Sequence, residues 1–125
     1  MKKSLVLLLL SSLVSGLYAR QPRTVVEPPF AFHNSGTLEI ERIELAPEST
    51  TVYIQAYFRP HNWIRISSET YIRTGAEGEK LTVRSADGMP LDTEFYMPET
   101  GRHDFSLSFP PVDPKTAKID LIESD

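Results

Sequence analysis

The chain has 125 residues, of which 13 are Lys or Arg and 17 are Asp or Glu, so its net charge is −4, and it contains no cysteine. This length is enough for one ordinary domain with a hydrophobic core. The lack of cysteine excludes disulfides, thiolate metal sites, a cysteine nucleophile and a lipid anchor attached to cysteine. The acidic balance argues against nucleic acid and anionic lipid surfaces as partners, because both require a basic face.

Residues 1–19 have the three parts of a secretory signal peptide. Lys2 and Lys3 form the positive start, an apolar run begins at Leu5, and Ala19 is a small residue at the expected cleavage point. The apolar run of about ten residues is too short for a hydrocarbon core that needs roughly 20, so we expect no stable membrane insertion. An uncleaved anchor and a buried core helix are the alternatives. We therefore expect export to the periplasm, the cell surface or the extracellular space.

Cleavage after residue 19 leaves 11 basic and 17 acidic residues, a net charge of −6. Residues 20–35 are predicted to be an extended lead or a first edge strand around Arg23–Val26. Prolines at positions 22, 28 and 29 fix φ and remove backbone donors in this stretch. We expect residues 36–125 to form the folded domain.

Alternation of apolar and polar residues begins at Thr37 and predicts strands. The apolar positions shift by one residue at Glu41-Arg42, which predicts a β-bulge. Residues 51–59 give the clearest strand. One of its faces is apolar and the other carries Tyr53, Gln55, Tyr57 and Arg59.

Further strands are expected at residues 63–67, 70–74, 80–85, 93–97, 103–109 and 117–123. No window has a sustained helical period. Short strands with turn signals every eight to twelve residues are typical of a sandwich. The sequence thus predicts an all-β fold, an immunoglobulin-like antiparallel β-sandwich of seven or eight strands, with a closed barrel as the second choice.

The polar residues give no convincing catalytic motif. His33, His61 and His103 are scattered singly, whereas metal ligands usually include a closely spaced pair, so we expect surface or turn histidines and no metal. The sequence has no G-x-S-x-G element around a serine. Its paired carboxylates alternate outward, as solvated strand faces do. We predict a protein that is not an enzyme and has no cofactor.

The segment from Tyr53 to Arg65 is the most suggestive part of the chain. The candidate ligand or docking surface consists of Tyr53, Tyr57, Arg59, Trp63 and Arg65. Exposed aromatic rings flanked by hydrogen-bonding side chains are typical of glycan-binding faces. The alternative is that Trp63 is the core tryptophan common in sandwiches and that the tyrosines stabilise sheet edges. Adjacent strand residues face opposite sides, so Trp63 lies outside if its neighbour Ile64 lies inside.

Five motifs carry a resemblance to a known region. They are Tyr57–Pro60 with Trp63–Ile66, Pro90–Asp92 with Phe95–Glu99, and finally Ile119–Glu123. Residues 36–125 resemble the immunoglobulin-like sandwich of exported Bacteroidota proteins, a region of unassigned function. In those proteins the sandwich often precedes a thioredoxin-like or hydrolase module. The resemblance implies the fold and the compartment, and it transfers no catalytic residue.

These observations lead to an expected function. The first choice is an exported, non-enzymatic interaction or spacer module of unknown partner, with another protein module or a glycan as the candidate partners. The second is a carbohydrate- or peptide-binding sandwich, and the weakest is a small hydrolase or inhibitor. Partner identity and oligomeric state are not predicted.

Overall fold

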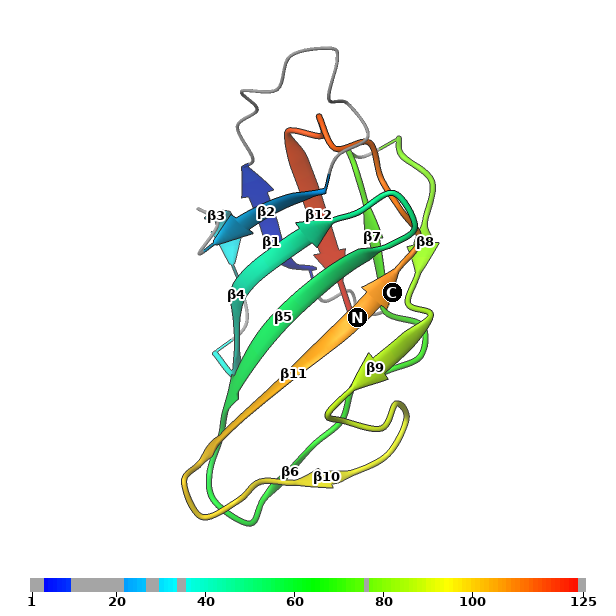
Figure 1. Ribbon diagram of the computed structural model, residues 1–125. Coiled ribbons are helices and arrows are strands. Elements are labelled where there is room, and N and C mark those ends of the chain that lie inside the picture. Colours follow the sequence, from blue (N-terminus) through cyan, green and yellow to red (C-terminus); the bar gives the residue numbers. More distant parts are fainter. Residues whose placement is uncertain (1–3, 10–21, 27–29, 34–35, 76, 124–125) are drawn as a thin grey trace.

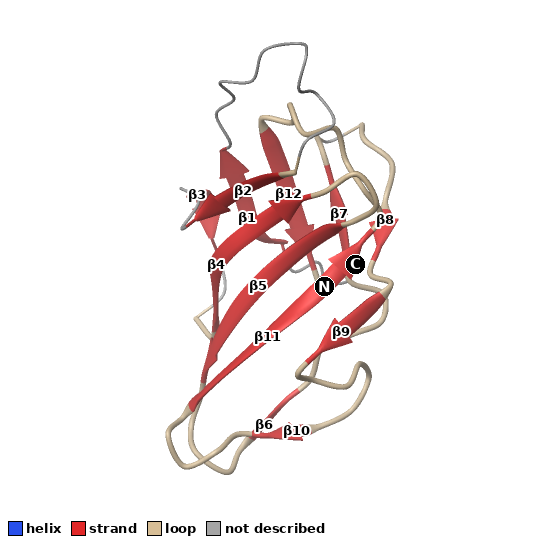
Figure 2. Cartoon of the chain, viewed as in Figure 1, coloured by secondary structure: helices blue, strands red, loops and turns tan. Residues whose placement is uncertain are grey.

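The computed structural model describes residues 4–9, 22–26, 30–33, 36–75 and 77–123. These residues form twelve strands and no helix (Figure 2). The all-β prediction is confirmed, and the strands are antiparallel throughout. Most of the predicted leader, residues 10–19, lies outside the described residues.

The strands form two five-stranded sheets and a two-stranded ribbon. The front sheet contains, in spatial order, β2 (Arg23–Val26), β4 (Leu38–Leu45), β5 (Thr50–Tyr57), β11 (Arg102–Phe109) and β9 (Ser85–Asp87). The rear sheet contains β3 (Phe30–His33), β1 (Ser4–Leu9), β12 (Lys118–Ile122), β7 (Tyr71–Arg73) and β8 (Leu81–Thr82). The ribbon consists of β6 (Trp63–Ile64) and β10 (Phe95–Tyr96), and Figure 1 shows it beyond the lower end of the front sheet.

One hydrophobic core lies between the two five-stranded sheets. The front sheet contributes Ile54, Leu107 and Phe109, and the rear sheet contributes Ile72 and Ile119, all of them buried. Alternate residues of β5 and β11 point inward, which is why the sequence alternates so cleanly there. The two inner faces form a sandwich.

The predicted bulge is present where the apolar positions shift. The register of β4 against β5 shifts between Ile40 and Arg42. Because the bulge inserts one residue, Leu38 and Ile40 before it and Ile43 and Leu45 after it are all buried. The residue types of β4 therefore encode both the strand and its irregularity.

The number of strands is larger than the seven or eight expected. Two of the additional strands, β1 and β3, lie within residues 1–35. Another arises because the strand expected at residues 80–85 is divided between the sheets. β8 pairs with β7 in the rear sheet, whereas β9 pairs with β11 in the front sheet. Between β8 and β9, where the chain passes from the rear sheet to the front sheet, Val83 N donates to Thr70 O (2.8 Å) and Arg84 N donates to Ser108 O (2.7 Å). Both sheets therefore hold this short segment.

Candidate functional site

Strand β5 presents two of the predicted site residues on the outer face of the front sheet. Val52, Ile54 and Ala56 are buried on its inner face, so the alternating Tyr53 and Tyr57 point outward. Tyr57 lies opposite Arg102 of β11. This part of the prediction agrees with the structure.

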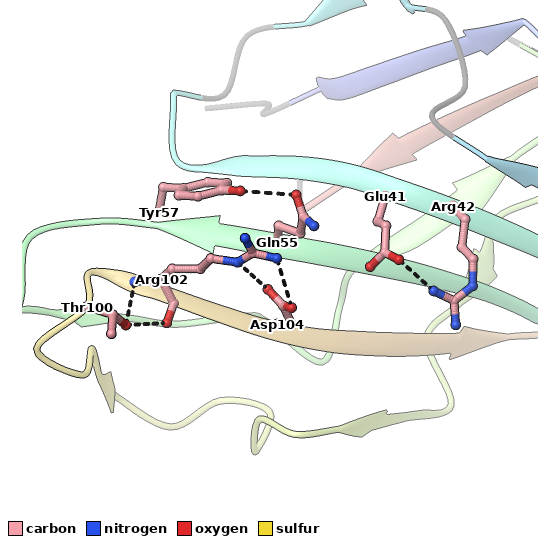
Figure 3. Close-up of polar contacts among 7 residues, drawn as sticks. All are labelled: Glu41, Arg42, Gln55, Tyr57, Thr100, Arg102 and Asp104. Carbon is pink, nitrogen blue, oxygen red and sulfur yellow. Dashed lines mark hydrogen bonds and ion pairs between the residues drawn. The ribbon is translucent and has the colours of Figure 1, made fainter.

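Tyr53 is engaged by neighbouring side chains of β4. Its hydroxyl donates to Glu44 Oε1 (3.0 Å), and the Arg42 guanidinium carbon lies 3.6 Å from the centre of its ring. The hydrogen bond to Glu44 is the main cause of a raised Tyr53 pKa. Arg42 also pairs with Glu41 (2.7 Å), as Figure 3 shows. Tyr53 therefore belongs to a network within the sheet.

A second polar network lies farther along the same face (Figure 3). Arg102 donates from Nε and Nη2 to the two carboxylate oxygens of Asp104, at 3.1 and 3.2 Å. The Arg102 guanidinium carbon lies 5.7 Å from the ring centre of Tyr57, whose hydroxyl donates to Gln55 Oε1 (3.1 Å). These exposed pairs contribute little free energy of folding.

The other three predicted site residues lie away from that face. Arg59 belongs to a turn after β5, in which Asn62 N donates to Arg59 O (3.2 Å). Trp63 lies on β6 with 47% of its surface exposed, so the interpretation as a core tryptophan is wrong. Arg65 Nη2 lies 3.7 Å from Asp92 Oδ1. The predicted surface is thus divided among the front sheet, the turn after β5, and the ribbon with the residue that follows it.

The structure gathers exposed aromatic residues at one end of the sandwich. Five large hydrophobic side chains are exposed among the described residues, and four of them belong to segments 57–63 and 95–102. These four, Tyr57, Phe58, Trp63 and Tyr96, are here called the aromatic end. Both segments lie at the lower end of the molecule in Figure 1.

Backbone hydrogen bonds join the two segments of the aromatic end. Phe58 N donates to Gly101 O (3.0 Å) and His61 N to Met97 O (2.9 Å). Trp63 stands opposite Tyr96 across the ribbon, so the two side chains project from one face of it. Phe58 and Tyr96 were not among the predicted site residues. Alternation within residues 93–97, where Phe95 is partly buried and Met97 fully, would have indicated an outward Tyr96.

His103 anchors the ribbon to the front sheet. Its ring stacks on Phe95 of β10 with centroids 4.3 Å apart, and on Phe105 of β11 with centroids 6.4 Å apart. Its Nε2 is hydrogen-bonded to Gly88 O. This histidine is partly buried near the start of β11. Among the described residues, no group of three His, Asp or Glu side chains is placed to hold a metal ion.

Asp92 fixes the loop next to the ribbon. It accepts from Ser68 N (2.9 Å), faces Arg65, and donates from its own N to Ile66 O (2.8 Å). Hydrogen bonds from the Ser68 side chain and backbone hold the pKa of Asp92 below its usual value, with a smaller contribution from Arg65. Its φ of 59° is one that Asp and Asn tolerate better than other side chains.

The lowered pKa of Asp92 gives a pH prediction. Because the folded pKa lies below that of the unfolded chain, the charged carboxylate stabilises the fold above the ordinary Asp pKa of about 3.9. This contribution is lost as the pH falls through the folded pKa. We expect Asp92→Asn to lower the thermal midpoint at pH 7 and the difference from wild type to shrink below about pH 4. Thermal melts of both proteins from pH 7 to pH 2.5 test this, and a constant difference would contradict it.

Comparisons with protein-family models, curated proteins and solved structures found no match to this chain. Within the described part of the chain, no helix has the length and apolar character needed to cross a membrane.

Proposed function

We propose that the chain is an exported, non-enzymatic interaction module of the periplasm or cell surface that docks another protein module through its aromatic end. One observation carries the proposal. Four of the five exposed large hydrophobic side chains of the described residues lie on two hydrogen-bonded segments at one end of the sandwich. Interfaces are enriched in aromatic residues, which dominate binding when they become buried.

The charged side chains on the outer face of the front sheet pair with one another, which favours a structural role for them. Arg102 and Asp104 bind each other, and Arg42 is held between Glu41 and Glu44. Charged groups that already pair within the sheet offer fewer free donors and acceptors to a ligand. The net charge of −6 expected after cleavage favours a partner with a neutral or basic surface.

A second candidate function is carbohydrate binding on the same residues. It is favoured by the ribbon, where Trp63 and Tyr96 stand opposite each other and are 47% and 61% exposed. Two neighbouring aromatic rings form an apolar platform of the kind that sugars stack on. The proposed function also includes two expectations about the fold: an immunoglobulin-like topology and a resemblance to the sandwiches of exported Bacteroidota proteins.

The test compares Trp63→Ala and Tyr96→Ala with Val26→Ala. Val26 is the matched control, because it is exposed (63%) but lies on edge strand β2, away from the aromatic end. Cross-linking in the exporting cell, followed by affinity measurement with the captured protein, should show a loss of about 30-fold for each aromatic variant and none for Val26→Ala.

Two other outcomes decide between the candidates. Binding to a glycan array that is lost in Trp63→Ala and kept in Val26→Ala would establish the second function in place of the first. Equal binding by all three variants would contradict docking through the aromatic end. Circular dichroism of each variant confirms that the fold is intact.

A further inference from the structure

Strand β12 is held on one side by the body of the domain and on the other by the predicted leader. β7 pairs with one side of it, and β1, which is Ser4–Leu9, pairs antiparallel with the other. In the register, Val6 stands opposite Leu121 and Leu8 opposite Ile119. Figure 1 shows β1 beside β12 in the rear sheet, whereas the aromatic end lies below.

Removal of the predicted leader during export would change the rear sheet. If residues 1–19 are removed, as the proposed function requires, β12 loses its partner on the β1 side. The backbone donors and acceptors along that side then lack their sheet partners, beside the buried side chains of Ile119, Leu121 and Ile122. An open edge of this kind is a template for another strand.

The nearest remaining strand, β3, cannot take the place of β1 without moving and pairing in the opposite sense. β3 pairs antiparallel with the other side of β1, so β3 and β12 run in the same direction. For β3 to join β12 it would have to move by the width of one strand, about 4.8 Å, and form a parallel pair. Antiparallel addition of a new strand restores the pairing found in the structure.

We propose that the exposed edge of β12 in the exported protein accepts a strand from a partner polypeptide, by β-strand addition. This inference rests on the export part of the proposed function, and it goes beyond docking at the aromatic end. The occupant is an extended segment that runs antiparallel to β12. Residues directly opposite each other share a face of the sheet, so its positions opposite Ile119 and Leu121 must be apolar.

The positions between them tolerate polar residues. Lys118 is exposed, and Asp120 already pairs with Arg73 of β7 (3.5 Å). The leader segment Ser-Leu-Val-Leu-Leu-Leu meets the apolar requirement at both positions. It is therefore a direct probe of the edge.

The experiment begins with the full chain secreted by a cell and purified, with its N-terminus determined by mass spectrometry. A synthetic peptide of residues 4–9, flanked by lysines for solubility, is then added. Hydrogen exchange of residues 118–122 is followed. We expect the peptide to slow exchange there by at least roughly tenfold.

Two control peptides test the register. Asparagine at the positions of Val6 and Leu8 should abolish the protection, whereas asparagine at those of Leu7 and Leu9, opposite Asp120 and Lys118, should leave most of it. Trp63→Ala should not affect the protection, so a failure of aromatic docking and a failure of strand addition are distinguishable. If the processed protein is unfolded alone, recovery of its β circular dichroism with the first peptide only is the supporting result.

The inference is overturned if no peptide changes the exchange or the circular dichroism. It is also overturned if residues 118–122 are fully protected without any peptide, because the chain then closes its own edge. An unprocessed N-terminus overturns it together with the export proposal, and the mass measurement identifies that case.

Discussion

Replacing Phe109 with alanine is expected to destabilise the domain by about 3–5 kcal/mol. Phe109 is completely buried at the end of β11 and is the largest fully buried side chain among the described residues. Its loss removes apolar contacts between the two sheets and leaves a cavity that the surrounding strands can only partly fill. Since domains of this size are stable by roughly 5–15 kcal/mol, this single change removes a large fraction of the total.

Urea unfolding followed by circular dichroism measures this effect. Ser108→Ala is the matched control, because Ser108 is the preceding residue of β11 on the outer face and is half-buried. It should change the free energy of unfolding by less than about 0.5 kcal/mol. A loss below about 1 kcal/mol for Phe109→Ala would mean that the sheets do not pack on this ring.

The sequence is informative wherever local alternation and burial coincide. β5 and β11 were predictable because one face of each is buried along its whole length, so residue type follows position. The bulge in β4 was predictable for the same reason, since the buried positions shift with it. These features depend on neighbouring residues within one strand.

Features that depend on distant residues could not be predicted in this way. Residues 80–85 resemble one strand, but Leu81 and Thr82 pair with β7 in the rear sheet, whereas Ser85 begins β9 and stands opposite Ser108 in the front sheet. The half-buried position of His103 likewise depends on Phe95, which the fold brings onto it from the ribbon.

The candidate site was predicted only in part. Tyr57 and Trp63 were identified from one continuous segment, and both belong to the aromatic end. Phe58 was assigned to the inner face of an expected strand reaching residue 59, but β5 ends at Tyr57 and Phe58 is exposed. Tyr96 was missed because it comes from a segment more than 30 residues away that pairs with Trp63 only in the fold.

Gly101 connects the two halves of the aromatic end, and its replacement by alanine is expected to cost about 2–3 kcal/mol. Its φ is +71°, a conformation that side chains with a Cβ rarely adopt. An added Cβ would also lie 2.9 Å from Phe58 O, a backbone atom that cannot turn aside. The strain therefore falls on the segment that carries Phe58, whose N donates to Gly101 O.

Gly36→Ala is the matched control for this substitution. Nothing lies within 4 Å of a Cβ at Gly36, and its φ is not in the left-handed region, so alanine there should be neutral or stabilise by up to about 1 kcal/mol. Urea unfolding gives both free energies, and the emission of Trp63, the single tryptophan of the chain, reports the aromatic end directly. Gly101→Ala should shift that emission and weaken docking, while Gly36→Ala should do neither. If both variants behave alike, the turn at Gly101 does not determine the geometry of the aromatic end, and its rings must be held in place by side-chain packing alone.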